Sequence, residues 1–245
     1  MSELPPLREL PLFASVDEAT LSRLALDAKI ENFEDGGVIF RQGDPITAIV
    51  VILRGFVRVL RIAASGDETL ISILSQGESV NIAPPGADEV YNICAEAVGS
   101  ASVLKLPAGR FARLMRESPS LAEATLRDAR EKVAALVREI ESLKSHNADQ
   151  RLSRFILALC PVGEESVRFR LPYDKRLIAA RLGVTQETLS RAFAKLREIG
   201  VRTEARDVFV ENVGRLHAQC DNLGRLSRAP SQRRASGDEK VDALV

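Results

Sequence analysis

The segment Leu171–Val201 restricts the fold more than any other, because it reads as two short helices joined by a tight turn. The first helix is expected at about Asp174–Leu182, and Gly183 then supplies the left-handed backbone conformation that often ends a helix. Thr185 is a suitable N-cap for the second helix. The apolar face of that second helix consists of Leu189, Ala192, Phe193 and Leu196. This spacing predicts a helix-turn-helix.

The opposite face of the second helix carries side chains that can read DNA bases. Glu187, Ser190 and Arg191 are spaced i, i+3 and i+4, so they project side by side, and Thr185 and Gln186 precede them. In a major groove, Arg binds guanine as a fork, Glu accepts from the cytosine amino group, and Ser serves in either role. The alternative is a solvated amphipathic helix whose charges face water.

A β-hairpin is expected directly after this helix, with strands at Val201–Glu204 and Val208–Val210. A hairpin in this place is a wing, which usually lies over the phosphate backbone. Arg202 and Arg206 are candidate phosphate contacts, and the alternative is that they are ordinary surface arginines.

The charge distribution favours a nucleic-acid partner for this part of the chain. The whole sequence is neutral, with 34 Lys and Arg and 34 Asp and Glu. Residues 151–215 hold 13 Lys and Arg against 8 Asp and Glu, a net of +5, so the remainder carries −5. A basic segment on an acidic remainder is typical of a nucleic-acid-binding module attached to another domain.

A run of short β-branched or alternating segments lies between Val38 and Pro107, separated by turn signals such as Gly55, Gly99 and Ala83–Gly86. Strands at this spacing predict a small antiparallel barrel or jelly roll, and with the helices around it an α+β protein. Such a roll can enclose a small ligand, or its own side chains can fill the cavity. Before it we expect an irregular arm at residues 1–14 and a short helix at Ser15–Ala28.

A long helix beginning at Pro119 carries a heptad seam, in which apolar residues advance by alternating steps of four and three. The seam consists of Ala122, Leu126, Ala129, Val133, Leu136, Ile140 and Leu143. The simplest partner for such a seam is its copy in a second chain, which gives a two-fold dimer. The alternative is that the seam packs on the roll of its own chain.

These segments suggest four parts. Residues 1–118 are a sensor domain that ends in a helix at about Ala108–Met115, 119–146 are the dimerisation helix, 147–222 are the winged helix-turn-helix, and 223–245 are a disordered tail. A hinge is expected at His146–Asp149. The sequence has no charged-then-apolar leader and no apolar run of spanning length, which favours a cytoplasmic location without a membrane partner.

A β-roll, a long helix and a winged helix-turn-helix in this order resemble the CRP/FNR family of bacterial transcription regulators. The resemblance covers about residues 10–215, and its most specific part is GVTQETLSR at residues 183–191; RQGDP at Arg41–Pro45 also matches. It implies a roll of the cyclic-nucleotide-binding type (a double-stranded β-helix), a homodimeric activator, and RNA polymerase as a partner besides double-stranded DNA. The FNR branch has Glu, Ser and Arg at the positions of Glu187, Ser190 and Arg191, which implies inverted TTGAT-type half-sites. The overall pattern is most similar to that of the nitrogen-oxide regulators.

The sequence also bears on the signal that the roll would bind. Cyclic-nucleotide binders of this family follow a Gly-Glu pair with an Arg that holds the cyclic phosphate. Gly77 and Glu78 are present here, but residues 62–104 contain no Lys or Arg. Because a buried phosphate without a cation is costly, we expect no tight cAMP binding.

Cysteine and histidine content limits the cofactors. Three cysteines, Cys94, Cys160 and Cys220, are fewer than the four thiolates that an iron–sulfur cluster needs. Cys94 lies in the predicted roll, where it is a candidate haem ligand or redox sensor, with Met115 as a further possible ligand; the alternative is a small buried apolar residue. Gly77, Glu78 and Cys94 are thus the candidate effector pocket, and the cofactor is left open.

The sequence features above are compatible with three functional classes. The favoured one is a signal-gated, homodimeric transcription factor. The second is a constitutive DNA binder whose roll senses nothing. The third, an enzyme on the same roll, is disfavoured because residues 1–118 contain no histidine for a metal site and no nucleophile–base set.

Overall fold

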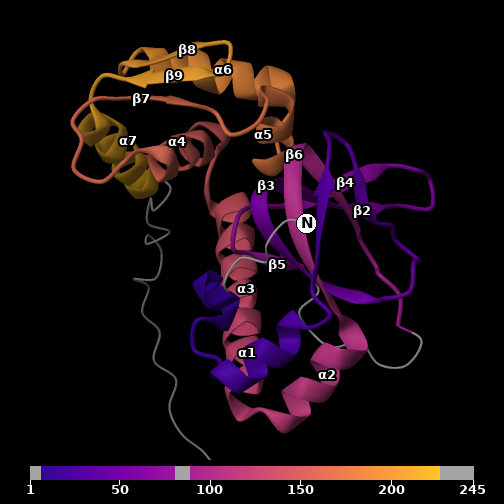
Figure 1. Ribbon diagram of the computed structural model, residues 1–245. Helices are drawn as coiled ribbons and strands as arrows, with labels where there is room; N and C mark the ends of the chain where they lie inside the picture. Colours follow the sequence, from indigo (N-terminus) through magenta and orange to yellow (C-terminus); the bar gives the residue numbers. More distant parts are fainter. Residues whose placement is uncertain (1–6, 81–88, 227–245) are drawn as a thin grey trace, which may run out of the picture.

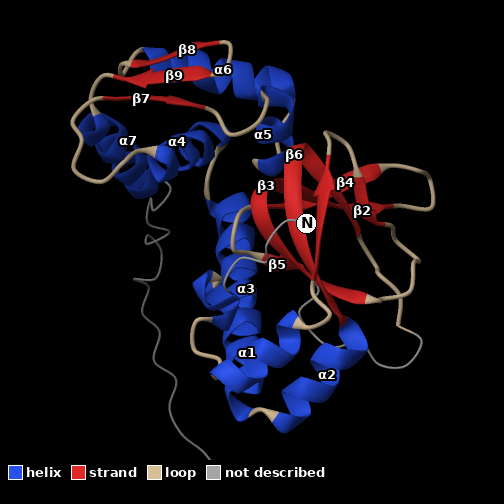
Figure 2. Cartoon of the chain, in the orientation of Figure 1, coloured by secondary structure: helices blue, strands red, loops and turns tan. Residues whose placement is uncertain are grey.

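The N-terminal part of the chain forms a β-roll in the computed structural model, which describes residues 7–80 and 89–226 (Figures 1 and 2). Within these residues, six strands make one antiparallel sheet in the order β1-β6-β3-β4, with β2 paired to β6 and β5 to β3. The strands are β1 (Lys29–Phe33), β2 (Val38–Phe40), β3 (Ala48–Ile62), β4 (Glu68–Leu74), β5 (Ser79–Val80) and β6 (Cys94–Pro107). The expected antiparallel roll is confirmed.

Two pairs of expected short strands are in fact single long strands. β3 continues through Gly55 and β6 through Gly99, and β6 begins only at Cys94. Gly55 has a φ of +80°, and a Cβ there would lie 2.3 Å from the carbonyl oxygen of Ser100. Glycine therefore lets β3 bend at its register shift against β6 without leaving the sheet. The turn expected at Ala83–Gly86 lies outside the described residues.

The edge strand β1 has no counterpart among the strands that the sequence predicts. Its sequence, Lys-Ile-Glu-Asn-Phe, has only two apolar residues, so its own composition gives little signal. Pairing with β6 holds it in place, and Lys105 Nζ lies 2.6 Å from Glu31 Oε2 across the two strands. The partner strand, rather than local propensity, makes this segment extended.

Residues 7–13 form two 3₁₀ turns, η1 (Leu7–Glu9) and η2 (Pro11–Phe13), instead of the irregular arm that the sequence suggested. Leu7, Leu12 and Phe13 of these turns are buried, and Phe13 is fully inaccessible. They share a hydrophobic cluster with α1 (Glu18–Ala25), α2 (Ala108–Glu117) and the first turns of the long helix α3 (Pro119–Ser145). The predicted helices at Ser15–Ala28 and Ala108–Met115 are confirmed within a few residues.

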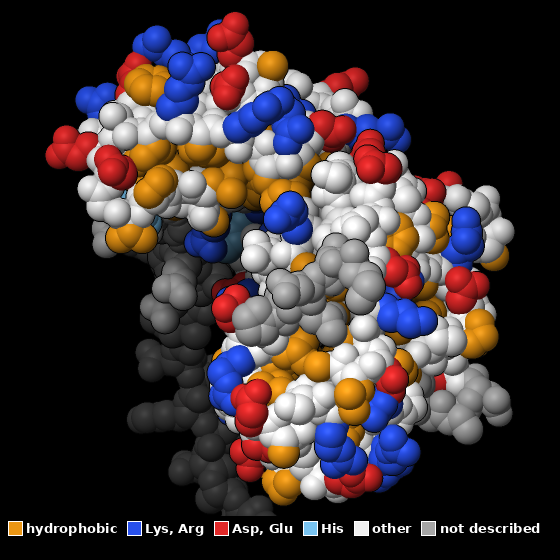
Figure 3. All heavy atoms as spheres, in the orientation of Figure 1, with side chains coloured by type: hydrophobic (Ala, Val, Ile, Leu, Met, Phe, Trp, Pro, Cys, Tyr) orange, Lys and Arg blue, Asp and Glu red, His pale blue; other side chains and the backbone are white. Residues whose placement is uncertain are grey.

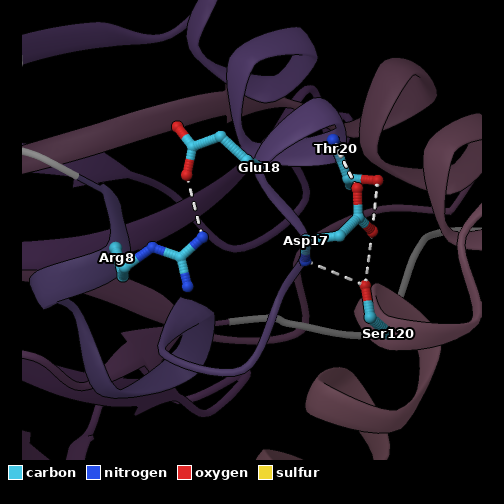
Figure 4. Close-up of polar contacts among 5 residues, drawn as sticks. All are labelled: Arg8, Asp17, Glu18, Thr20 and Ser120. Atoms are coloured by element: carbon cyan, nitrogen blue, oxygen red, sulfur yellow. Dashed lines mark hydrogen bonds and ion pairs between the residues drawn. The ribbon is translucent and has the colours of Figure 1, made fainter.

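Asp17 joins the start of α1 to the start of α3 (Figure 4). Its carboxylate caps α1 by accepting from Thr20 N at 2.8 Å, and it also accepts from the hydroxyls of Ser120 at 2.6 Å and Ser118 at 3.0 Å. These hydrogen bonds favour the ionised form, so the pKa of Asp17 lies well below its usual range, with Ser120 the largest cause. Ser118 is in turn the N-cap of α3.

The long helix α3 has one face against the roll and one face open. Leu121, Ala124 and Thr125 are buried, and Asp128 and Lys132 pair with each other further along this face, where both contact Ser79 of β5. Figure 1 shows α3 running from the end near α1 and α2 toward the C-terminal unit. The helix therefore spans the two globular parts.

The C-terminal unit is built from helices packed on a small sheet. Its elements are α4 (Ala148–Leu159), β7 (Val167–Arg170), α5 (Lys175–Arg181), α6 (Gln186–Arg197), β8 (Val201–Glu204), β9 (Asp207–Val210) and α7 (Val213–Leu226), and the sheet order is β7-β9-β8. Only His146 and Asn147 separate α3 from α4, since Asn147 forms a capping box with Gln150. The expected four-residue hinge is thus shorter in the structure.

The helix α7 is absent from the sequence prediction, which placed a disordered tail from residue 223. α7 packs along α4 and continues to Leu226. The rest of the predicted tail, residues 227–245, lies outside the described residues. The core of the C-terminal unit also includes Ile73 of β4, and the ring of Phe56 meets that of Tyr173 edge-on at 5.6 Å. The two globular parts are therefore in direct contact.

Candidate nucleic-acid interface

The helices α5 and α6 have the predicted helix-turn-helix geometry. Asp174 caps α5 by accepting from Leu177 N at 2.7 Å, and Gly183 has a φ of +61° in the turn. Thr185 caps α6 by accepting from Thr188 N at 3.2 Å. The predicted apolar face of α6 is buried: Leu189, Ala192, Phe193 and Leu196. Capping and burial together fix which face of α6 points outward.

The outward face of α6 presents the candidate base-reading residues to solvent. Thr185, Gln186, Glu187, Ser190 and Arg191 are all exposed. Ser190 donates to the Gln186 carbonyl at 2.9 Å, and Arg191 Nη2 lies 3.4 Å from Thr188 Oγ1. Neither Glu187 nor Arg191 forms an ion pair with any described residue. Their charges are free to meet a ligand.

The wing is formed by β8 and β9, with Ala205 in the turn at a φ of +49°. Arg202 is exposed on β8 and forms an ion pair with Glu211. Arg206 instead points inward, because its Nε and Nη2 donate to the Leu171 carbonyl at 3.1 and 2.7 Å. Arg206 therefore holds the wing to the start of the helix-turn-helix, which is a structural task that the sequence did not suggest.

Two basic residues that the sequence prediction did not single out belong to this surface. Arg176 is exposed in the first turn of α5, the helix that crosses the backbone in helix-turn-helix complexes. Lys195 is exposed on α6 and pairs with Asp149 of α4. For Arg176, the only signal in the sequence was that a basic residue stands at the start of the first predicted helix. On the face drawn in Figure 3, Lys and Arg side chains are spread over the C-terminal unit.

The larger side chains of the heptad seam of α3 are exposed to solvent. Leu126 is 71% exposed, Val133 60% and Ile140 52%, while Ala129 is half-buried. Leu136 and Leu143 are also exposed. Apolar side chains in a continuous row with this exposure are unusual on a monomeric surface. The seam does not pack on the roll of its own chain.

The candidate effector residues of the roll do not come together in one site. The Glu78 carboxylate accepts from Ser75 N and Oγ at 2.7 and 2.8 Å, so it closes its own turn. Gly77, with a φ of +86°, lies against Pro11. Cys94 is buried beside a cavity lined by residues of β2 and β6, and its sulfur accepts from Gln42 N at 3.2 Å. Lys132, which contacts Ser79 of β5, comes from α3 and is already paired with Asp128.

The possible cofactor ligands are also dispersed. Met115 lies on α2 and packs against the cluster shared with α1, whereas Cys94 is the first residue of β6, at the other end of that strand from α2. Cys160 ends α4 and Cys220 lies on α7. Among residues 7–80 and 89–226, no group of three or more His, Cys, Asp or Glu is arranged to hold a metal ion. No helix in the same ranges is both long and apolar enough to cross a membrane.

Comparisons with known proteins match both parts of the chain. Residues 30–118 match the model of the cyclic nucleotide-binding domain, and residues 150–219 match that of the Crp-like helix-turn-helix domain. The transcriptional activator protein anr of Pseudomonas aeruginosa is 26% identical over 210 residues, which are 82% of this chain and 84% of anr. The nitrogen fixation regulation protein FixK of Bradyrhizobium diazoefficiens is 26% identical over 79% of this chain and 82% of its own.

Solved structures show the same architecture. A protein from Ruegeria pomeroyi, proposed to bind cyclic nucleotides, is 31% identical with a TM-score of 0.63 over 88% of this chain and 96% of its own. FixK2 from Bradyrhizobium japonicum is 20% identical with a TM-score of 0.68 over 79% of this chain and 97% of its own, which supports the fold.

The fold and the exposed recognition helix define a DNA-binding transcription regulator with a cyclic-nucleotide-binding-like domain, not an enzyme. The chain belongs to the CRP/FNR family.

Proposed function

We propose that this regulator is a homodimer that reads an inverted pair of TTGAT-type half-sites, one with each copy of α6. The observation that carries the proposal is the outward face of α6, where Glu187, Ser190 and Arg191 are exposed and both charges lack an ion-pair partner among the described residues. Arg191 would bind the guanine of each half-site as a fork, and Glu187 would accept from the bases paired opposite. Ser190 still has free lone pairs while it donates to Gln186.

Dimerisation would run through the seam of α3. Seven residues at alternating spacings of four and three form an apolar row, in which the five larger side chains are exposed, and its copy in a second chain would cover it. A two-fold axis along the seam would place the two recognition helices in successive major grooves, about 34 Å apart. An inverted repeat in the DNA would then match the symmetry of the protein.

Contacts to the DNA backbone would come from basic residues around α6. Arg202 on the wing and Arg176 at the start of α5 are exposed, and both would contact phosphates, Arg202 after leaving its ion pair with Glu211. Arg206 would act through the wing, because its guanidinium is bound to Leu171 O. Affinity should fall steeply with salt as these side chains displace counterions.

The roll (residues 1–118) would sense a signal, α3 (within 119–146) would transmit it, and the winged unit (147–222) would respond. The signal would act by a population shift toward the dimer in which both recognition helices fit the groove spacing. Tight cAMP binding is not expected, since residues 62–104 lack a cation and Lys132 is paired. RNA polymerase would be a further partner at the promoter, with activation as the outcome.

A gel-shift titration tests this function. Wild-type protein should bind an inverted TTGAT duplex more tightly than a scrambled duplex at the same salt, and Arg191→Ala should lose most of that difference. Arg113→Ala is the matched control, because Arg113 is an exposed arginine on α2, outside the C-terminal unit. Cell extract is added in a second titration to supply the unknown signal. Equal affinity of wild-type protein for both duplexes in both titrations would contradict the proposal.

A second candidate, a constitutive DNA binder with a roll that senses nothing, is favoured by one observation: Glu78 closes its own turn and faces no cation of the roll. Purified protein that binds its site tightly without any small molecule, and whose affinity no small molecule changes, would select this candidate.

A further inference from the structure

A cavity of about 570 Å³ lies where the roll, α3 and the C-terminal unit meet. β4 of the roll forms one wall, with Leu70 and Ile71, and α4 and α5 form another, with Arg154 and Arg181. The cavity is large enough for a small organic molecule. It is separate from the cavity beside Cys94.

Three guanidinium groups reach this cavity from the C-terminal unit, and none of them forms an ion pair with a described residue. Arg151 donates to the carbonyls of Leu143 and His146 at 3.3 and 2.8 Å, and its Nε is buried without a hydrogen-bond partner. Arg181 donates to Tyr173 OH at 2.6 Å. Arg154 is exposed and makes no hydrogen bond within the described ranges. Arg181 also lies over the ring of Phe155, 5.7 Å from its centroid. No described carboxylate pairs with any of the three positive charges.

The carboxylates of the cavity do not neutralise these arginines. Glu78 is bonded to Ser75 in its own turn, and Glu139 of α3 forms no ion pair in the part of the chain that the structure describes. Lys132 is paired with Asp128. The remaining lining is mainly apolar, with Ile73 from the roll and Phe155 from α4 among its members. The side formed by β4 is thus mainly apolar, whereas the side formed by α4 and α5 combines Phe155 with the three arginines.

We propose that this cavity binds a small organic anion, with its apolar body against β4 and its acidic group against the arginines of α4 and α5. Guanidinium groups bind carboxylates, sulfonates and phosphates through paired, charge-assisted hydrogen bonds. The cations for the ligand would thus come from the DNA-binding unit, because the roll segment 62–104 has none. The inference deepens the proposed function and rests on it, since the anion would be the signal.

A ligand in this place would contact both globular parts at once. It would stabilise the arrangement in which β4 packs on the C-terminal unit, in proportion to its greater affinity for that arrangement. The orientation of α6 relative to the seam of α3 would then depend on the ligand. DNA binding and anion binding would therefore be linked, with equal coupling in both directions.

A second copy of the chain is the competing occupant. Leu136 and Leu143 belong to the dimer seam and also line the cavity. In a dimer, the partner's α3 would cover these two residues and could either complete the cavity as a further wall or fill it. The test must therefore be made on the dimer.

A pair of fluorescent probes separates the acidic group from the apolar body. 8-Anilinonaphthalene-1-sulfonate and N-phenyl-1-naphthylamine share the same aromatic body, and only the first carries a sulfonate. Full-length dimeric protein should bind the sulfonate at one site per chain, and more tightly than the neutral probe. Octanoate and octyl phosphate, but not 1-octanol, should displace it, and the tighter competitor tells a carboxylate ligand from a phosphate ligand.

Two charge variants with opposite expected effects give the sharpest result. Arg154→Gln should weaken sulfonate binding by about tenfold, the scale of one charge-assisted hydrogen bond, and leave the neutral probe unchanged. Glu139→Gln should tighten sulfonate binding, because it removes a negative charge from the cavity. Arg168→Gln is the control, since Arg168 is exposed on β7 of the same unit and does not line the cavity.

Three results would overturn the inference: equal affinity for both probes, an unchanged sulfonate affinity in Arg154→Gln, or loss of probe binding as the chain concentration rises through dimer formation. The last would mean that the second copy fills the cavity. Gel shifts on the same samples keep the two proposals apart. Absent anion binding with intact TTGAT binding contradicts only this inference, whereas absent TTGAT binding with intact anion binding contradicts the proposed function.

Discussion

Arg181 of α5 donates a hydrogen bond from Nη1 to the hydroxyl of Tyr173 at 2.6 Å, and the ring of Tyr173 meets Phe56 of the roll. Tyr173 is only 2% exposed. The first helix of the helix-turn-helix is thus tied to a residue at the contact between the two globular parts. A change at this contact would reach the recognition unit directly.

Tyr173→Phe should therefore change stability with a defined pH dependence. Burial raises the pKa of the Tyr173 phenol above its usual range, and the nearby Arg181 lowers it by less. Because the pKa is raised, the contribution of the neutral Tyr173 hydroxyl to folding stability is complete below the unfolded pKa of about 10. It is lost as pH rises through the folded value. The variant should lose roughly 1 kcal/mol at pH 7 and then fall less steeply than wild type above pH ~10. Urea unfolding at pH 7 and at several pH values above ~10 gives the free energy of unfolding of both proteins. If that free energy falls with pH equally in the variant and in wild type, the prediction is wrong.

Asp17→Asn tests the link between α1 and α3 at the acidic end. The pKa of Asp17 is lowered by hydrogen bonds from Ser120, Thr20 and Ser118, so its stabilisation is present above the unfolded pKa of about 4 and is lost as pH falls through the folded value. Asn keeps the N-cap but has no carboxylate. We expect the difference in Tm between wild type and variant to shrink from pH 6 to pH 2. Glu18→Gln, at an exposed neighbouring carboxylate, should not change this dependence.

The seam of α3 predicts the assembly state. Val133→Glu combined with Ile140→Glu places two charges in the exposed apolar row, and we expect monomers, because a buried unpaired charge is costly. The matched control is Arg138→Glu, which also adds negative charge at an exposed position of α3, but off the seam. Analytical ultracentrifugation distinguishes the two. A monomeric wild type, or a double variant that stays dimeric, would count against the seam.

The wing predicts a salt dependence. Arg202→Ala should weaken binding to specific and scrambled duplexes alike, because a phosphate contact carries no sequence information. The slope of log affinity against log salt should decrease in magnitude by about 1 for each lost contact, so by about 2 for a dimer. Fluorescence anisotropy at several salt concentrations gives the slope. A loss confined to the specific duplex would mean that Arg202 contacts bases instead.

The sequence predicted the helix-turn-helix well because its signals are local. Gly183 in the turn, Thr185 as a cap and four apolar residues at helical spacing each depend on neighbours in the chain. The strand β1 and the continuity of β3 through Gly55 depend on pairing with β6, which no local pattern reveals.

The candidate effector residues of the roll were also hard to predict, because their contacts depend on the tertiary structure. Glu78 and Cys94 are close enough in sequence to suggest one pocket, but their side chains turn to Ser75 and Gln42. The arginines of the junction cavity lie within α4 and α5, about 80 to 110 residues after β4, and only the packing of the two units brings them to the roll. A wide separation in sequence conceals a site that tertiary contacts create.

A thermodynamic cycle shows whether Arg191 binds the guanine of each half-site. Wild type and Arg191→Ala are each titrated, at one salt concentration, with the inverted TTGAT duplex and with a duplex in which the guanine of both half-sites is replaced by adenine. Wild type should lose about 1–3 kcal/mol per half-site on the base change, and Arg191→Ala should lose almost nothing. If the variant discriminates against the changed base as strongly as wild type, Arg191 does not bind this guanine.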